Sequence, residues 1–225
     1  MKDLTTGQYI LKELTGRFRV TKKNIGTYGK MNRGPLHLSI DCYDVQNLGH
    51  YCILSVKGMF GLMNMETAVL AVTSKDIPLI NFDAMRVGMK KLQLAEFYDT
   101  LLEDDNSLLR MECISIRNAD DDLEDYQSGG HEYDSKLLDY SYGKKTKASS
   151  SRTDISAKRY ADAVFNELQR AEDCDEQAKK EKIRRFAESL ISAGGPAVSM
   201  FTKMFGEETA KKVVLQYMYG CESQD

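Results

Sequence analysis

Short hydrophobic runs with a two-residue period fill residues 18–98, and they constrain the fold more than any other feature of the chain. Gly, Asn and Lys turns separate these runs roughly every ten to fifteen residues, a spacing typical of an antiparallel sheet. The clearest run alternates Leu36, Leu38, Ile40 and Cys42 with His37, Ser39, Asp41 and Tyr43. One face of such a strand is apolar and the other is polar. We expect about six strands in this region.

The octapeptide Asp76–Asp83, Asp-Ile-Pro-Leu-Ile-Asn-Phe-Asp, predicts the start of a further strand. Pro78 has no backbone N–H, so it fits the first residue of a strand or an edge position. From Leu79 onward, alternation sends Asn81 and Asp83 to the same face, among apolar neighbours. The segment therefore predicts a carboxylate in the middle of a strand.

A second extended run, residues 92–98, follows a turn near residues 88–91. A four-residue loop would place Glu96 opposite Asp83, so that two carboxylates share one site. A carboxyl group among apolar side chains has its charged form disfavoured, and it can then keep a proton near neutral pH and deliver it as a general acid. An exposed Asp83, or one paired with Lys or Arg, is the structural alternative.

A helical period replaces the two-residue period after residue 153. Asp154 and Asp175 are suited to cap two successive helices, and Gly194-Gly195-Pro196 ends the second and begins a third. Glu207-Glu208 favours the start of a last helix. With a weaker helical pattern in residues 4–14, the order is helix, sheet, then helices. We predict an α+β fold, a three-layer α/β/α sandwich around one central antiparallel sheet.

We interpret residues 1–225 as one domain. It comprises an N-terminal helix in 1–15, a mainly antiparallel sheet in 18–117, an acidic loop and flexible linker in 118–153, and a helical layer in 154–220. Residues 118–125 are rich in Asp and Glu, whereas 143–153 combine basic and small polar residues. The secondary structure of residues 57–65 and 101–117 stays open.

Composition excludes several classes of protein. A net charge of -3 and a pI near 5.7 argue against a nucleic-acid or anionic-membrane binder. Polar residues throughout 1–14 offer neither a signal peptide nor a spanning helix, so we expect a cytoplasmic location. The five cysteines lack a C-x-x-C pair and are expected to be free thiols. The three histidines lie far apart, so no metal site is expected.

Three segments carry a resemblance to a known family. Pro35-Leu36-His37-Leu38-Ser39-Ile40 is similar to a strand of the type K-V-H-L-E-L, and Ile77–Asp83 to a segment of the type L-P-I-F-G-A-D. The stretch from Gly195 through Phe205-Gly206-Glu207-Glu208 to Tyr217 is similar to a closing pair of helices. Together these segments resemble the ferredoxin-dependent bilin reductases.

The resemblance implies an enzyme, an oxidoreductase that binds an open-chain tetrapyrrole (a bilin) between the sheet and the helices. Electrons would come from ferredoxin, without a bound metal or flavin cofactor, and the protein would supply protons. Asp83 matches the family's proton-donating aspartate, and His37 matches its strand histidine, which would act as a helper of Asp83 or as a substrate contact. Ser39, where the family has Glu, and Glu96 are expected to contact the substrate.

Two other interpretations remain open. A non-catalytic relative would bind a tetrapyrrole or similar planar ligand in the same cleft. A protein-interaction domain without a small ligand would use the acidic loop 118–125 and the linker 143–153 as contact surfaces. A cleft lined by Asp83 and His37 would favour the first two interpretations, and their exposure on a convex face would favour the third.

Overall fold

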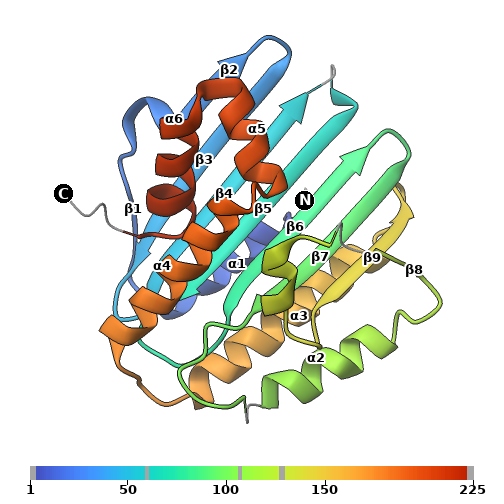
Figure 1. Cartoon of the computed structure of the whole chain (residues 1–225). Coiled ribbons are helices and arrows are strands. Elements are labelled where there is room, and N and C mark those ends of the chain that lie inside the picture. The colour runs from blue at the N-terminus through green and yellow to red at the C-terminus, as the bar shows by residue number, and fades with distance from the viewer. Residues whose placement is uncertain (1–3, 59–60, 106–107, 127–129, 222–225) are drawn as a thin grey trace.

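One antiparallel sheet forms the centre of the computed structural model, which describes residues 4–58, 61–105, 108–126 and 130–221 (Figure 1). Across these residues the sheet has nine strands, in the order β1-β3-β4-β5-β6-β7-β9-β8, with β2 paired to β3. The strands are β1 (Val20–Lys22), β2 (Lys30–Arg33), β3 (Leu36–Val45), β4 (Gly49–Gly58), β5 (Met63–Val72), β6 (Leu79–Val87), β7 (Lys90–Tyr98), β8 (Glu124–Asp125) and β9 (Tyr142–Lys147). Consecutive strands β3 to β7 pair with their neighbours, so short hairpins connect the middle of the sheet.

Helices cover both faces of this sheet (Figure 1). They are α1 (Thr6–Arg17), α2 (Leu108–Asn118), α3 (Arg152–Arg170), α4 (Glu176–Ser192), α5 (Pro196–Phe205) and α6 (Glu207–Lys212). Three shorter elements are the 3-10 helices η1 (Gly26–Gly29) and η3 (Glu132–Lys136) and the π-helix η4 (Val213–Met218). Helices α1 and α3 lie on one face, with α2 beside α3, while α4, α5, α6 and η4 lie on the other. This arrangement confirms the predicted α+β sandwich.

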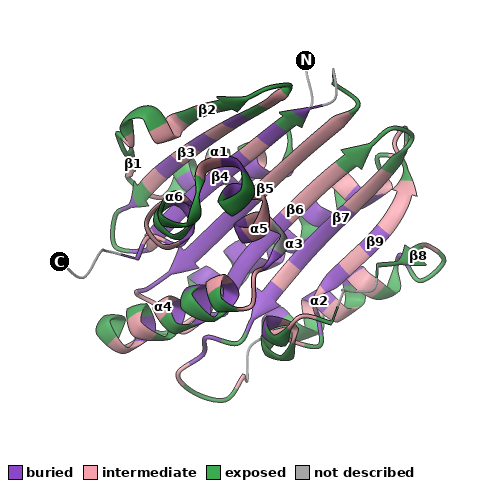
Figure 2. Ribbon diagram, turned by 45° about the horizontal axis from the view of Figure 1, so that its top comes forward, coloured by how far each residue is buried: buried purple, intermediate pink, exposed green. Residues whose placement is uncertain are grey.

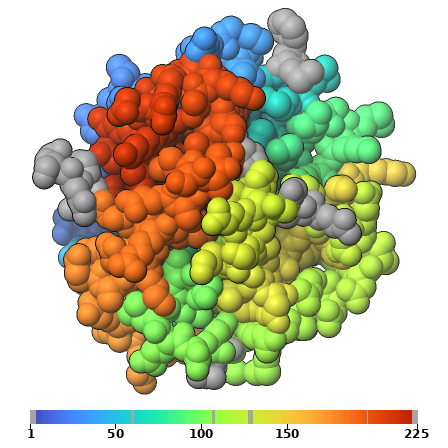
Figure 3. Space-filling model, viewed as in Figure 1, coloured from blue at the N-terminus to red at the C-terminus, as the bar shows by residue number. Residues whose placement is uncertain are grey.

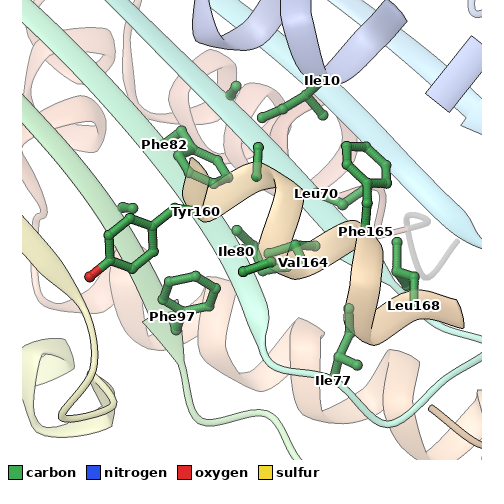
Figure 4. Close-up of a cluster of buried hydrophobic side chains, with 14 of the residues drawn as sticks. Ile10, Leu70, Ile77, Ile80, Phe82, Phe97, Tyr160, Val164, Phe165 and Leu168 are labelled. Atoms are coloured by element: carbon green, nitrogen blue, oxygen red, sulfur yellow. The ribbon is translucent and has the colours of Figure 1, made fainter. Parts of the chain in front are cut away.

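Two hydrophobic cores result, one on each side of the sheet. The core under α1 and α3 includes Ile10, Leu70, Phe82, Val164 and Phe165 (Figure 4). The core under the C-terminal helices includes Leu38, Leu54, Ile183, Phe201 and Val214. Figure 2 shows the strands buried where helices cover them and exposed at their outer ends. Because both faces are covered at the middle of the sheet, a polar side chain there is enclosed by protein whichever way it points.

Several predicted boundaries agree with the structure. The Asp175 side chain accepts hydrogen bonds from the backbone N–H groups of Gln177 and Ala178, both at 3.0 Å, and caps α4. Helix α5 begins at Pro196, where a missing N–H costs nothing. The open stretch 101–117 contains α2. The other open stretch, 57–65, is divided between the end of β4 and the start of β5, apart from residues 59–60, which lie outside the described residues.

The predicted flexible linker is wrong for its first half, because residues 142–147 form β9 between β7 and β8. This strand is too polar for its period to be visible, and cross-strand ion pairs compensate its charges. Lys144 is buried, yet its ammonium group lies 2.8 Å from Asp125 on β8. Lys145 pairs at 2.9 Å with Glu124, which also lies on β8. A basic strand is therefore stable beside an acidic one.

The acidic segment 118–125 is also not a freely solvated loop. Asp120 is only 2 % exposed and accepts hydrogen bonds from Tyr142 at 2.7 Å and Ser156 at 2.5 Å. The Arg152 guanidinium group completes the cluster, 2.6 Å from both Asp120 and Asp122. The segment thus ties the start of α3 to β9.

We predict that Asp120→Ala lowers the free energy of unfolding by about 3 kcal/mol, because it leaves buried donors and part of the Arg152 charge unpaired. The matched control is Asp121→Ala, whose exposed side chain should contribute no more than about 0.5 kcal/mol. Urea denaturation of both variants measures the difference. Equal stabilities of the two variants would contradict the assigned role of Asp120.

Candidate functional site

Asp83 lies on the face of the sheet that the C-terminal helices cover. It pairs with Thr67 on β5, and Thr67 in turn lies across from Leu54 on β4. Residues that are paired directly across an antiparallel sheet point to the same face. Leu54 belongs to the core under the C-terminal helices, so Asp83 faces that layer too.

The structure does not bring His37 or Ser39 to Asp83. Leu38 and Ile40 point into the core under the C-terminal helices, so alternation sends His37 and Ser39 to the opposite face. His37 is exposed, and its Nδ1 lies 2.8 Å from Oδ1 of Asn32. The expected roles of His37 as helper and of Ser39 as substrate contact are therefore wrong for this site.

Glu96 does lie beside Asp83, in a different register from the predicted one. The turn between β6 and β7 has only two residues, Gly88 and Met89, and Gly88 adopts a positive φ of 58° that favours such a tight turn. This short turn pairs Asp83 with Leu94, and Glu96 with Asn81. Asp83 and Glu96 are consequently diagonal neighbours on one face, where the charge of one carboxyl group affects the pKa of the other.

Two hydroxyl groups complete the carboxyl pair. Thr67 donates a hydrogen bond from Oγ1 to Oδ1 of Asp83, and Tyr98 donates one from its hydroxyl group to Oε2 of Glu96 at 3.0 Å. No Lys or Arg is among the groups that shift the pKa of either carboxyl. Two buried carboxylates this close repel each other, so the pair binds a proton more readily than an isolated carboxyl group does. The pair is therefore built to hold a proton.

The surroundings raise the pKa of both carboxyl groups. Burial is the largest cause for Asp83, and the hydrogen bond from Thr67 offsets it only in part. Burial is also the largest cause for Glu96, and the negative charge of Asp83 raises its pKa further. The pair thus keeps a shared proton at a pH where an exposed carboxyl has lost its own.

A cavity of about 160 Å³ lies in front of the pair, between β5–β7 and the covering elements. Its outer wall includes His131 and Tyr133 on the segment of η3, and Tyr219 after η4. Figure 3 shows the C-terminal helices, in orange and red, against the yellow-green residues around 130–140 on this side of the molecule. Asn81 reaches the same cavity, where its Nδ2 donates to the Tyr219 hydroxyl at 3.3 Å and its buried Oδ1 has no partner.

A second cavity of about 390 Å³ continues along the β6–β7 hairpin. The two cavities share Met85, Leu92 and Tyr126 as lining residues. The outer cavity is bordered by four lysines, Lys90, Lys91, Lys145 and Lys147, and by Glu124, which pairs with Lys145. An apolar floor with a basic rim thus adjoins the site of the carboxyl pair.

The sequence did not identify most of the residues that line the inner cavity. Thr67 lies within the region 18–98 of short hydrophobic runs, and Tyr98 ends the run that contains Glu96, so both had a signal in the strand pattern. His131, Tyr133 and Tyr219 come from segments without such a pattern, and only the folded chain brings them to the sheet. Within the described ranges, no three His, Cys, Asp or Glu residues gather as a metal site would require, and no helix is suited to span a bilayer.

The shared proton predicts a pH-dependent stability. The folded state binds this proton more tightly than the unfolded chain, so the free energy of unfolding should fall as the pH rises above the unfolded Glu value of about 4.3. Each unit by which the pKa is raised corresponds to about 1.4 kcal/mol. Glu96→Gln should flatten this fall, whereas Glu132→Gln, at an exposed position, should keep it. Urea denaturation across this pH range provides the test, and an unchanged slope in Glu96→Gln would count against the shared proton.

Comparison with known proteins supports the fold of this site. No family model and no curated protein sequence matches the chain. A solved structure does match: the crystal structure of phytochromobilin synthase from tomato in complex with biliverdin, at a TM-score of 0.77 and 12% sequence identity. The match covers 94% of this chain and 80% of that one. The chain therefore has the fold of a ferredoxin-dependent bilin reductase, as its remote sequence resemblance implied.

Proposed function

We propose that this protein binds an open-chain tetrapyrrole against the β5–β7 face of the sheet and protonates it during reduction by electrons from ferredoxin. The observation that carries the proposal is the buried Asp83–Glu96 pair beside a cavity, in surroundings that raise the pKa of both carboxyl groups. The fold is shared with a protein whose crystal structure contains biliverdin. A proton donor beside the ligand site is what the reduction of a conjugated tetrapyrrole requires.

The chemistry assigns a role to each member of the pair. Reduction of one double bond adds two electrons and two protons to the substrate. Ferredoxin would supply the electrons one at a time, and Asp83 would deliver a proton that it shares with Glu96. Glu96 thus takes the helper's role that the resemblance implied for His37. Reprotonation of the pair from water completes the cycle.

The size of the cavity decides how such a ligand would lie. Ligand pockets for molecules of this class occupy about 300–1,000 Å³, more than the inner cavity offers. The outer cavity of about 390 Å³ adds the missing room along Met85, Leu92 and Tyr126. One end of the tetrapyrrole would face Asp83, and its carboxylate side chains would reach the lysines of the outer rim.

The same rim suits a negatively charged electron donor. Lys90 and Lys147 are exposed beside the outer cavity, and Lys145 lies between them and Tyr126. Basic groups at the mouth of a site steer an acidic partner and raise its association rate. A ferredoxin with an acidic surface would then dock close to the ligand that it reduces.

A non-catalytic binder of the same fold is the second candidate. The observation that favours it is the environment of Asp83, whose side-chain partners are Thr67 and Glu96, without a histidine among them. The protein-interaction alternative has lost its basis, since the acidic segment and half of the linker are engaged within the fold through Asp120, Arg152 and β9.

We predict that Asp83→Asn retains biliverdin binding and lowers the rate of its reduction at least about a hundredfold, because the amide keeps the shape but has no acidic proton to give. The measurement is an absorption titration of the purified protein with biliverdin, followed by anaerobic addition of reduced ferredoxin. His37→Gln is the matched control and should reduce biliverdin at the wild-type rate.

Each outcome separates the candidates. Binding followed by a spectral change in wild type, and by none in Asp83→Asn, supports the enzyme. Binding without reduction in wild type supports the non-catalytic binder. Full activity in Asp83→Asn would remove the proton-donor role, and failure to bind biliverdin would remove the proposed function.

A further inference from the structure

Two cysteines face each other across the hairpin of β3 and β4. Cys42 and Cys52 are directly paired in the strand register, and their Sγ atoms lie 3.8 Å apart. Directly opposite residues in an antiparallel sheet have Cα and Cβ separations at or near the range that a disulfide spans. Formation of a bond would need only a small approach of the two sulfurs.

The C-terminal π-helix η4 rests on this pair. The Cys42 thiol donates a hydrogen bond to the Tyr217 carbonyl oxygen at 3.1 Å, and Nε2 of His50 lies 2.9 Å from the same oxygen. Two residues further along the chain, Tyr219 forms part of the wall of the Asp83 cavity. The cysteine pair thus helps to hold the segment that closes the site.

Cys42 has the surroundings of a reactive thiol. The adjacent Cys52 thiol lowers the pKa of the Cys42 thiol, which increases the fraction of the nucleophilic thiolate. Burial instead keeps the pKa of Cys52 well above its usual value. A polar cavity of about 410 Å³ has His50, Tyr219 and Cys221 in its lining, so it reaches the edge of the cluster but not the two buried sulfurs themselves.

We propose that Cys42 and Cys52 form a reversible disulfide on reaction with a hydroperoxide, and that this bond loosens η4. The Cys42 sulfur attacks a peroxide oxygen and the O–O bond breaks. This step releases one water molecule and leaves Cys42 as a sulfenic acid. The Cys52 sulfur then attacks the Cys42 sulfur, the S–S bond forms, the S–O bond breaks, and a second water leaves. The two sulfurs together lose two electrons, which hydrogen peroxide gains.

Oxidation would destabilise η4 because it removes a hydrogen-bond donor. The disulfide carries no S–H group, so the Tyr217 carbonyl keeps only its bond with His50. Net loss of one hydrogen bond corresponds to about a fivefold change in a local opening equilibrium. A disulfide at the limit of its preferred geometry is also readily reduced, so a thiol reductant restores the original state.

The test treats the full-length protein with hydrogen peroxide and analyses the tryptic peptide 34–57, which holds both cysteines and has no Lys or Arg before its end. We expect this peptide to lose the mass of two hydrogen atoms and to regain it with dithiothreitol. Amide hydrogen exchange in 213–219 should become about fivefold faster on oxidation. This readout requires no bilin, so it is independent of the proposed function.

Matched variants sharpen the test. Cys113→Ser removes a buried cysteine on the other face of the sheet and should behave as wild type. Cys42→Ser keeps a hydrogen-bond donor for Tyr217. Neither Cys42→Ser nor Cys52→Ser should form the disulfide or show faster hydrogen exchange after peroxide treatment. If one of these two variants fails to fold, the other provides the control. Absence of the intrapeptide disulfide, or oxidation to sulfinic acid instead, would overturn the proposal. A disulfide without faster exchange would overturn its effect on η4.

Discussion

Helices enclose both faces of the central part of the sheet, so a charged side chain buried between the layers needs an opposite charge or a bound proton. The buried Lys179 on α4 meets this constraint with an opposite charge, since its ammonium group lies 2.8 Å from Asp76 and 2.8 Å from the Thr100 carbonyl oxygen. Asp83 and Glu96 meet it differently. Among the described residues, no Lys or Arg forms an ion pair with either carboxyl group, and the pair relies instead on a bound proton. Charge compensation holds a fold together, whereas an uncompensated carboxyl pair at a cavity is suited to acid chemistry.

The position of Asp83 within a strand could be predicted because local signals agree there. Pro78 marks where a strand can begin, and the following alternation is unambiguous. The alternation of β3 was equally clear, yet it could not say whether His37 shares a face with Asp83. That relation depends on the register of two intervening strands, β4 and β5, and therefore on hairpin lengths along the way. A strand's own pattern fixes its two faces but not which layer each face meets.

The register of Glu96 illustrates the same limit on a smaller scale. A two-residue turn at Gly88-Met89 in place of a four-residue loop moved its direct partner from Asp83 to Asn81. The two carboxyl groups stayed together because a shift of two residues preserves the face of the sheet. Strand β9 was missed for another reason. Its stability comes from ion pairs with β8, which are visible only once the two segments are adjacent.

The central claim is that Asp83 and Glu96 hold one proton between them near neutral pH. Infrared difference spectroscopy tests it directly, because a protonated carboxyl group has a carbonyl stretch that a carboxylate lacks. We expect the wild-type protein to show this band at neutral pH and to lose it in Glu96→Gln. A wild-type spectrum with carboxylate bands alone would contradict the account, since both groups would then be ionised and no proton would be available for a ligand.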